Sequence, residues 1–468
     1  MSFTERFFKL KENNTTAGRE IYAGLLSFLA VAYILAVNPA ILSSTGMDKG
    51  GIFYATALSA FAGTMIMAFL ANYPLVLAPA MGLNAFFAYS VVNAMGYSWQ
   101  FALFAIVVEG IVFLLLSFSS IREKIILTIP MPLKYAMSGG IGLFITLIAL
   151  KNAQVIQAHP TTLVSIQHFS GPDFHTRGIS AVLALVGVLV STYLLHRKCP
   201  GALLFGIFGT WILGIICQLT GIYHVQPDAG FNSLIPDWNL EELSSPLLSF
   251  CDLFGSAFHV SKWSGKSAEV SGWPLIFSAD FAVICFSFLF TDFFDTLATT
   301  NGALIDTPLM KKDGSIPRLK KLLIADSLAT LVGGIFGTST TTTYAESAIG
   351  IRSGARTGLA AVTAGVLFLI SLFCAPFFLR IPGFATAPAL IIVGFLMLQA
   401  ISHLDWQDLT SAIPAYLLLT GIVFTYNVSD GLGFGIISYT ILNCRIKGRV
   451  NFIHWILTLL FFAKYICF

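Results

Sequence analysis

Long apolar stretches separated by short polar ones run along almost the whole chain. A bilayer hydrocarbon core of about 30 Å needs roughly 20 apolar residues per helix. On that scale the pattern predicts about fourteen membrane spans, of which the thirteenth is long and interrupted. The predicted spans are 21–42, 52–71, 75–92, 101–119, 135–150, 178–196, 201–222, 275–300, 321–338, 341–351, 358–379, 383–403, 412–443 and 453–467. The chain is therefore expected to be an all-α, multi-pass membrane protein.

A polar stretch at 223–274 divides the predicted spans into two groups of seven. An odd number of spans per half gives the halves opposite membrane orientation, which is the inverted-repeat plan of many secondary transporters. The third span of each half is short and interrupted, by Pro79, Gly82 and Asn84 in the first half and by a Thr/Ser run with Glu346 in the second. Paired broken segments of this kind indicate a binding site near the bilayer midplane.

Composition excludes several classes of protein. Of the 468 residues, 56% are apolar and only 10% are charged, whereas soluble domains carry roughly a quarter charged residues. The net charge of +3 is too small to indicate nucleic-acid binding. Seven scattered cysteines and eight histidines, mostly in predicted loops, indicate neither a disulfide framework nor a metal site. We expect no metal and no cofactor, and the chain has no Walker A pattern for ATP.

The distribution of charge predicts orientation. Lys and Arg gather in the loops at 122–134, 197–198, 311–321 and 445–449, whereas the 223–274 loop is acidic. By the positive-inside rule, the N-terminus and the basic loops lie in the cytoplasm. The expected location is the plasma membrane, as in a bacterial inner membrane. If 412–443 is a helical hairpin, 453–467 becomes an odd extra crossing, and the sequence leaves that open.

Two carboxylates stand out in the eighth span, within Leu289-Phe-Thr-Asp-Phe-Phe-Asp-Thr. Asp292 and Asp295 are three positions apart, so both lie on one helical face. A charge at the bilayer centre costs at least about 2.5–3.5 kcal/mol, so such residues are usually functional or paired. Two neighbouring carboxylates resist double ionisation, which is what a proton-coupling site needs. The alternative is a structural pair satisfied by the backbone and by Thr hydroxyls.

Six consecutive hydroxyl residues, 338–343, precede Tyr344 and Glu346 in the tenth span. β-branched Thr favours extended backbone, so we expect a short strand that leads into a half-helix beginning near Tyr344 or Glu346. A helix start offers free N–H donors and a positive dipole end. A carboxylate there can accept two hydrogen bonds from a flat heterocycle, although Glu346 as a plain helix cap is the structural alternative. Asn84, in the matching element of the first half, offers both a donor and an acceptor.

Other charges also lie within predicted spans. For Glu109 in the fourth span and Asp326 in the ninth, structural pairing and a place on a proton pathway remain equally open. Arg352 and Arg356 lie near the cytoplasmic end of the tenth span, where they are interpreted mainly as positive-inside anchors.

These motifs are those of a known family. The chain resembles the nucleobase–cation symporter-2 family, and within it the AzgA-like branch of purine permeases. The resemblance extends over almost the whole chain, and several long motifs occur in the family's order. They are Arg19-Glu-Ile-Tyr-Ala-Gly, Ala32-Tyr-Ile-Leu-Ala-Val-Asn-Pro, Met81-Gly-Leu-Asn-Ala-Phe-Phe, Asp292-Phe-Phe-Asp-Thr, Gly337-Thr-Ser-Thr, Glu346-Ser-Ala, Arg356-Thr-Gly-Leu, Thr425-Tyr-Asn and Asp430-Gly.

The resemblance implies a fold of fourteen helices in two inverted seven-helix repeats. Spans 1–4 and 8–11 form a core domain that carries the substrate, and spans 5–7 and 12–14 form a gate domain. Short antiparallel strands in spans three and ten frame the site, and relatives with this fold often pair through their gate domains. The implied division is a cytoplasmic N-terminus at 1–20, core at 21–119, gate at 120–222, an extracytoplasmic loop at 223–274, core at 275–379 and gate at 380–468.

The implied activity is import of purine bases (hypoxanthine, guanine or adenine), coupled to protons, by elevator-like alternating access; an enzyme is not expected. The implied substrate-binding residues are Asn84, Asp292 and Glu346, with Phe86, Phe87 and Tyr344 as candidates to stack on the ring. The implied proton-coupling residues are Asp292, Asp295 and Glu346. Ala298 replaces a glycine that is common in the family, and four threonines precede Tyr344. Both departures leave the preferred purine open.

Two alternatives remain at this stage. An anion transporter can share the inverted seven-helix plan, but it should place a basic residue or an open helix end at the site, where this chain has acids. A membrane prenyltransferase binds magnesium diphosphate through paired aspartates, which Asp292 and Asp295 superficially match. No basic clamp for a diphosphate lies near that pair in the sequence.

Overall fold

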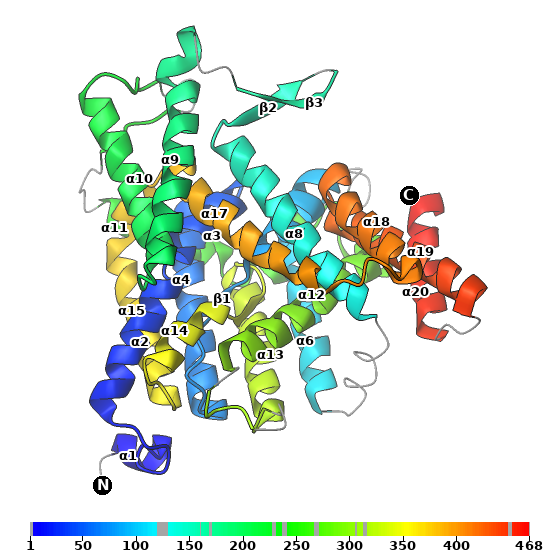
Figure 1. Ribbon diagram of the computed structural model, residues 1–468, viewed down its shortest axis with the longest axis horizontal. Coiled ribbons are helices and arrows are strands. Elements are labelled where there is room, and N and C mark those ends of the chain that lie inside the picture. The colour runs from blue at the N-terminus through cyan, green and yellow to red at the C-terminus, as the bar shows by residue number, and fades with distance from the viewer. Residues whose placement is uncertain are drawn as a thin grey trace.

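The structure is a computed structural model of the chain. It describes residues 3–118, 130–159, 161–167, 171–226, 231–235, 241–265, 271–304, 307–311, 316–447 and 452–467. Parts of the basic loops that predict orientation, including residues 122, 124, 312 and 449, lie outside the described residues. Figure 1 shows the helices and strands, with the N-terminus at the bottom and the β2–β3 hairpin at the top.

The first half of the chain forms helices joined by short turns. Its helices are α1 (Phe3–Phe8), α2 (Ala17–Val31), α3 (Ile34–Leu42), α4 (Lys49–Ile66), α5 (Met81–Ala85), α6 (Trp99–Phe118), α8 (Met131–Asn152), α9 (Arg177–His196) and α10 (Ala202–Leu219). Its strands are β1 (Leu77–Pro79), β2 (Ile156–His159) and β3 (Leu163–Ile166). The β2–β3 pair is an antiparallel hairpin that follows α8.

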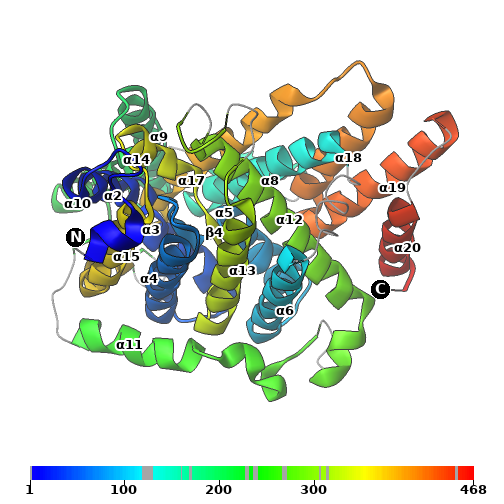
Figure 2. The ribbon, with the colours of Figure 1, turned by 90° about the horizontal axis from the view of Figure 1, so that it is seen from below.

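The second half begins with α11, which belongs to the polar stretch. Its helices are α11 (Glu241–Leu253), α12 (Ala279–Leu304), α13 (Leu319–Phe336), α14 (Ala348–Arg352), α15 (Gly358–Ile370), α16 (Ala375–Leu379), α17 (Gly383–Leu398), α18 (Leu409–Thr425), α19 (Val428–Lys447) and α20 (Phe452–Cys467). Its one named strand in the described residues is β4 (Thr341–Thr343). α11 lies along one flank of the molecule, beside α4 (Figure 2).

The predicted spans and the helices agree in position. Among the described residues, nine helices are long and apolar enough to cross a membrane. The predicted spans at 75–92 and 341–351 are broken into strand and short helix, as expected. The stretch at 412–443 is a hairpin of α18 and α19, which turns at Tyr426 with a left-handed φ of 58°. α20 has 16 residues, or about 24 Å of helix, which is shorter than the hydrocarbon core.

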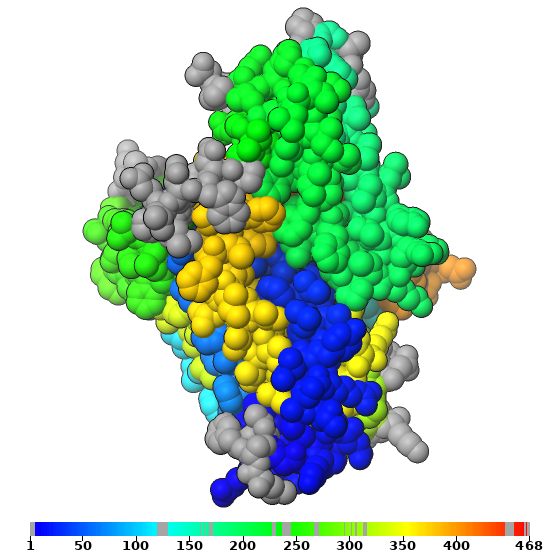
Figure 3. Space-filling model, turned by 90° about the vertical axis from the view of Figure 1, so that its left-hand side faces the viewer, coloured from blue at the N-terminus to red at the C-terminus, as the bar shows by residue number. Residues whose placement is uncertain are grey.

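The helices form two groups by their packing. We call α2–α6 with α12–α15 the core group, because α4, α6 and α12 pack on α13 or β4, and α15 packs on α2 and α4. We call α8–α10 with α17–α19 the gate group, because α17 packs on α8, α9 and α10, and α18 packs on α8 and α19. In the space-filling view, α2 and α15 lie side by side on one face, next to α10 (Figure 3).

Close helix packing depends on glycines, as is typical of helices in membranes. A Cβ on Gly24 of α2 would lie 2.3 Å from the Ala360 carbonyl oxygen of α15. In the gate group, a Cβ on Gly142 of α8 would lie 2.4 Å from the carbonyl oxygen of Gly394 on α17. Neither distance leaves room for a side chain, so the glycines allow the backbones to approach.

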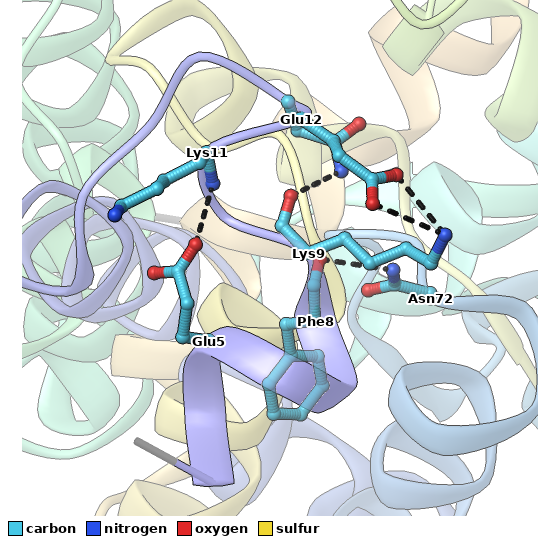
Figure 4. A network of polar contacts seen from close by, with 7 residues as sticks. Glu5, Phe8, Lys9, Lys11, Glu12 and Asn72 are labelled. Carbon is cyan, nitrogen blue, oxygen red and sulfur yellow. Dashed lines mark hydrogen bonds and ion pairs between the residues drawn. The ribbon is translucent and has the colours of Figure 1, made fainter. Parts of the chain in front are cut away.

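The N-terminal segment caps one end of the core group (Figure 4). Asn72, in the turn after α4, donates a hydrogen bond from Nδ2 to the Phe8 carbonyl oxygen at 3.3 Å. Its Oδ1 accepts from the Gly358 backbone N–H at 2.6 Å, so one side chain joins α1, α4 and α15. Lys9 and Glu12 form an exposed ion pair at 3.0 Å in the same segment.

Candidate functional site

The two broken segments meet as an antiparallel pair of short strands in the core group. In the register of β1 and β4, Leu77 lies opposite Thr343, Ala78 opposite Thr342, and Pro79 opposite Thr341. All six residues are buried. A left-handed residue turns the chain before each strand, Asn72 with φ 53° in the first half and Gly337 with φ 86° in the second. A Cβ on Gly337 would also lie 2.8 Å from the Leu253 Cβ, so that position requires glycine.

Side chains tie the ends of the two strands together. Tyr344 donates its hydroxyl to the Pro79 carbonyl oxygen at 2.5 Å and its backbone N–H to the Val76 carbonyl oxygen at 3.0 Å. The Val76 N–H in turn donates to the Ser347 hydroxyl at 2.9 Å. Because proline has no N–H to give to the ladder, these contacts hold β1 in register where backbone pairing ends.

A helix on either side satisfies the outer edges of the strands. On β1, the Leu77 N–H donates to the Thr64 hydroxyl of α4 at 3.0 Å, and that hydroxyl donates back to the Leu77 carbonyl oxygen at 3.1 Å. On β4, the Thr343 N–H donates to Asp326 Oδ1 of α13 at 3.2 Å. The Thr342 hydroxyl donates to the same oxygen at 2.9 Å. Asp326 therefore supports the strand, which is one of the two roles left open by the sequence.

A cavity of about 520 Å³ lies between the core group and the gate group. This volume is in the usual range for small-molecule sites. Its core-group wall includes Gly82, Leu83, Phe290, Thr291, Asp295 and Ala298, and its gate-group wall includes Met131, Lys134, Tyr135, Ile141, Met397 and His403. Met131 and Lys134 belong to the first turns of α8. The cavity therefore extends from the middle of α12 to the N-terminal end of α8.

Glu346 lies in the single 3₁₀ turn Ala345–Ser347 that joins β4 to α14, and it does not itself border this cavity. Its side chain is partly exposed, and the Tyr33 hydroxyl donates to its Oε1 at 3.1 Å. Tyr33 sits at the break between α2 and α3. Asp295 is near enough to interact electrostatically with both Glu346 and Tyr33. The structure thus brings two of the predicted acids, Asp295 and Glu346, together beside a tyrosine hydroxyl.

Asp292 occupies a different environment from Asp295, although both lie on α12. It is fully buried, does not border the cavity, and accepts a hydrogen bond from the Thr330 hydroxyl of α13 at 3.2 Å. The sequence interpretation expected Asp292 to contact the substrate or carry the proton, with Asp295 in support. In the structure α13 covers Asp292, and Asp295 is the one of the two that borders the cavity.

Asn84 is also fully buried and contacts the second half of the chain. Its Oδ1 accepts a hydrogen bond from the Ser339 hydroxyl, and its Nδ2 has no partner among the described residues. The neighbouring residues Gly82 and Leu83 border the cavity. Asn84 therefore joins α5 to the residues before β4 and keeps a free donor.

The three candidate aromatic side chains are buried in the core group. Phe86 and Phe87 are fully buried, and Phe86 packs edge-on against Phe288 at a centroid distance of 4.7 Å. Neither borders the cavity. Tyr344 is 6% exposed and uses its hydroxyl on β1, as described above. The structure therefore does not bring Phe86 or Phe87 to the cavity surface.

A larger cavity, of about 680 Å³, lies at the opposite end of α8, α4 and α17. Its wall includes Lys49, Asn152, Tyr223 and Arg380, and it contains none of the acids predicted for the site. Because Asp295 borders the smaller cavity and Glu346 lies near Asp295, the smaller cavity is the candidate site.

Sequence reasoning missed Tyr33, Lys134 and His403. Tyr33 lies within the quoted motif Ala32-Tyr-Ile-Leu-Ala-Val-Asn-Pro, and a polar residue beside a helix break was the available signal. Lys134 and His403 border the cavity from the gate group. Their contribution depends on how the two halves of the chain face one another, which no local pattern shows.

The fold is that of a multi-pass membrane protein in which two broken segments pair as short strands and a cavity lies between the core and gate groups. The matching sequence profile is that of the "Permease family", over residues 18–433. The chain is 37% identical to the adenine permease AdeP of Escherichia coli, over 94% of this chain and 90% of that protein. It is 37% identical to the guanine/hypoxanthine permease PbuO of Bacillus subtilis, over 96% of each. The chain belongs to this permease family, the nucleobase–cation symporter-2 family that its motifs predict.

Solved structures confirm the fold class. The transmembrane domain of the cyanobacterial bicarbonate transporter BicA superposes with a TM-score of 0.56, at 16% identity, over 89% of this chain and 97% of that one. At this identity the likeness shows the shared fold alone. Membership in a permease family points to a transporter and away from the prenyltransferase alternative.

Proposed function

We propose that the protein is a proton-coupled importer of purine nucleobases. The observation that carries the proposal is that Asp295, on the wall of a cavity of about 520 Å³ between the core and gate groups, lies near a second acid, Glu346. Purine as the substrate class is supported by the names of the relatives, an adenine permease and a guanine/hypoxanthine permease. The choice among hypoxanthine, guanine and adenine is left to experiment.

Glu346 would bind the N–H edge of the base. Tyr33 donates to Oε1 and so holds the carboxylate in one orientation, and the remaining lone pairs of the carboxylate could accept from the ligand. Hydrogen bonds to a charged group are worth about 1.5–3 kcal/mol each, so two such bonds decide whether a base is retained. Asp295, on the cavity wall, would face the same ligand from α12. Asn84 and Tyr344 would act by holding the crossed strands in place.

Protons would couple through the acids of the core group, which include Asp292, Asp295 and Glu346. No ion pair to Lys, Arg or His is present for Asp295, Asp292 or Glu346 among the described residues. Protonation would neutralise a carboxylate before the loaded core group moves past the gate group, so no unpaired charge would cross an apolar contact. One proton that moves down a 100 mV potential provides about 2.3 kcal/mol, which sustains near fiftyfold accumulation.

The movement would be elevator-like, with the core group sliding against the gate group. Contacts between the groups include small residues, since a Cβ on Gly82 of α5 would lie 3.0 Å from the Ile141 side chain of α8. With the N-terminus in the cytoplasm of a bacterial cell, the cavity would open inward in this structure. A homodimer would form through the gate group, which would then stay fixed while the core group moves.

The anion-transport alternative shares the fold but not the site chemistry. Lys134 is the one Lys or Arg in the described wall of the cavity, and it lies in the first turns of α8. The one acid in the described wall of the cavity is Asp295, and Glu346 lies near it. An anion would therefore meet negative charge on α12, at Asp295.

The test is uptake of radiolabelled hypoxanthine, adenine and guanine into cells that express the chain, with and without a protonophore. Unlabelled uracil and xanthine serve as competitors, and surface labelling confirms that the protein reaches the membrane. Saturable purine uptake that the protonophore abolishes supports both parts of the proposal. Uptake that persists with the protonophore removes proton coupling and keeps the substrate. No uptake of any base removes the proposed function.

A further inference from the structure

Glu109, in the middle of α6, is a buried acid that the proposed base-binding site does not use. It is 1% exposed, and its Oε2 accepts a hydrogen bond from the Thr340 hydroxyl at 3.0 Å. Its Oε1 receives no hydrogen bond from any other described residue. A buried carboxylate oxygen without a donor carries a large desolvation cost, so the carboxyl group needs another source of stabilisation.

That source is a second carboxyl group on α12. The side chains of Glu109 and Asp292 lie within hydrogen-bonding range of each other. Asp292 is fully buried, accepts from Thr330 through Oδ2, and has an Oδ1 that likewise lacks a donor among the described residues. In each acid, therefore, one carboxylate oxygen accepts a hydrogen bond from a threonine and the other has no donor among the described residues.

The surroundings supply no positive charge to this pair. The titratable groups that face it are Asp326 on α13, which packs against α6 and α12, and Cys285 and Asp295 on α12 itself. Among the described residues, neither Glu109 nor Asp292 forms an ion pair. Two ionised carboxylates cannot lie side by side in a dry site without a cation, so at least one proton must stay between them.

We propose that Glu109 and Asp292 share a proton and that this pair is where the coupling proton is held. The proposal rests on the proposed function, because it assigns a store to the proton of that transport cycle. With one shared proton the pair carries one negative charge, and a second proton makes it neutral. Glu109 is a positioning residue in this scheme, since it touches Asp292 and not the substrate.

Asp295 connects the pair to the cavity. It lies three residues from Asp292 on α12 and borders the open space, and side chains at that spacing are neighbours, about 5–6 Å apart at Cβ. On release, an O–H bond of the pair breaks, its proton forms an O–H bond on the Asp295 carboxylate, and the proton then passes to water in the cavity. The pair keeps the shared proton and regains its single negative charge.

The first test uses purified protein in liposomes and compares two modes of transport. Glu109→Gln should still exchange internal for external purine, with half-saturation within about threefold of the wild type, because the base-binding groups are intact. It should lose accumulation driven by an inside-negative potential of 100 mV, falling from about fiftyfold to equal concentrations on the two sides. Accumulation equal to that of the wild type would overturn the proposal.

Two variants serve as controls for this test. Glu12→Gln changes an exposed acid of the N-terminal segment in the same way and should accumulate purine like the wild type. Glu109→Asp keeps the carboxyl group and should recover part of the accumulation, which a purely structural role for the glutamate would not predict. If Glu109→Asp and Glu109→Gln lose accumulation to the same degree, the carboxyl group of Glu109 does not hold the coupling proton.

A second measurement does not depend on transport. Infrared difference spectra between acid and neutral pH report the C=O stretch of protonated, buried carboxyl groups. The wild type should keep such a band at neutral pH, and Glu109→Gln and Asp292→Asn should each lose it, whereas Glu12→Gln should not. A band that is absent from the wild type, or unchanged in both variants, would overturn the proposal. A wild type that shows the band but transports no purine would instead remove the proposed function.

Discussion

The two strands that cross at the site, β1 and β4, occupy matching places in the two halves of the chain and differ in side-chain chemistry. β1 is Leu77-Ala-Pro79 and offers no polar side chain, whereas every residue of β4 is threonine. The edge of β1 is completed by a neutral hydroxyl, that of Thr64, and the edge of β4 by a carboxylate, that of Asp326. The two strands repeat one backbone geometry, but the side chains that form hydrogen bonds belong to β4.

The buried acids follow the same division. Thr340 donates to Glu109, Thr342 donates to Asp326, and Thr330, which also contacts the Thr341 carbonyl oxygen, donates to Asp292. No carboxylate accepts a hydrogen bond from β1 among the described contacts. The first strand therefore acts as a frame, and the second, with the turn that carries Glu346, holds the groups that would bind substrate and protons.

Glu346→Gln should have the largest effect. Gln keeps the shape of the side chain but removes the charge that would accept from the base, and loss of two charge-assisted bonds lowers affinity about a hundredfold or more. Radiolabelled purine uptake should fall to background while surface labelling shows normal amounts of protein. Full uptake by this variant would remove Glu346 from the site. Glu12→Gln is the matched control and should transport normally.

Thr342→Val should have the next largest effect, because it removes a hydroxyl from β4. Asp326 Oδ1 loses one donor, and the Thr296 hydroxyl loses a partner at 2.7 Å. A hydrogen bond to a charged group is worth about 1.5–3 kcal/mol, so we expect a lower midpoint of thermal unfolding and an uptake rate reduced about tenfold. Equal stability and uptake in variant and wild type would show that the threonine network is not needed.

Thr64→Val is the corresponding change on the β1 side. It should destabilise the protein by about 1–3 kcal/mol, because the buried N–H and carbonyl oxygen of Leu77 lose their partner. Uptake per folded molecule should stay within about threefold of the wild type, and its dependence on pH should not change, since no acid is touched. If the pH dependence of uptake shifts in Thr64→Val but not in Thr342→Val, then β1, and not β4, is the strand that is linked to the titrating acids.

Leu77→Met should have the smallest effect. Leu77 lies opposite Thr343 and is fully buried. A swap that conserves volume usually costs less than about 1.5 kcal/mol, so uptake should remain within about twofold of the wild type. The matched change on the other strand, Thr343→Val, breaks contacts with Thr299 at 2.8 Å and Thr300 at 3.3 Å and should do more damage. Similar losses of uptake in both variants would show that β1 does more than hold the backbone of β4 in place.

Much of this arrangement could be predicted from sequence because it depends on local pattern. Apolar length gives the spans, and the run of threonines gives a strand that ends beside Glu346, since β-branched residues favour extended backbone. The hairpin of α18 and α19 was left open by the sequence. Its turn passes through Tyr426 in the left-handed conformation, which tyrosine rarely adopts, so the sequence did not fix the position of the turn.

The burial of Asp292 and the exposure of Asp295 to the cavity could not be predicted, because helical periodicity only shows that the two residues share a face. Which of them meets the cavity depends on the packing of α13 and β4 against α12, a contact between distant segments. The same holds for Phe86, whose position after Asn84 suggested the site but whose ring packs on Phe288. Glu109 could be identified as buried, but not as the neighbour of Asp292.

The most direct test of the site is an experimental structure of the protein with a purine base bound. We expect a base in the cavity between the core and gate groups, with its N–H edge within hydrogen-bonding distance of Glu346 and with Asp295 beside the ring. We expect Asp292 and Glu109 to make no contact with the base. A base bound in the larger cavity near Lys49 and Arg380, or one that contacts neither Glu346 nor Asp295, would show that the site is assigned wrongly.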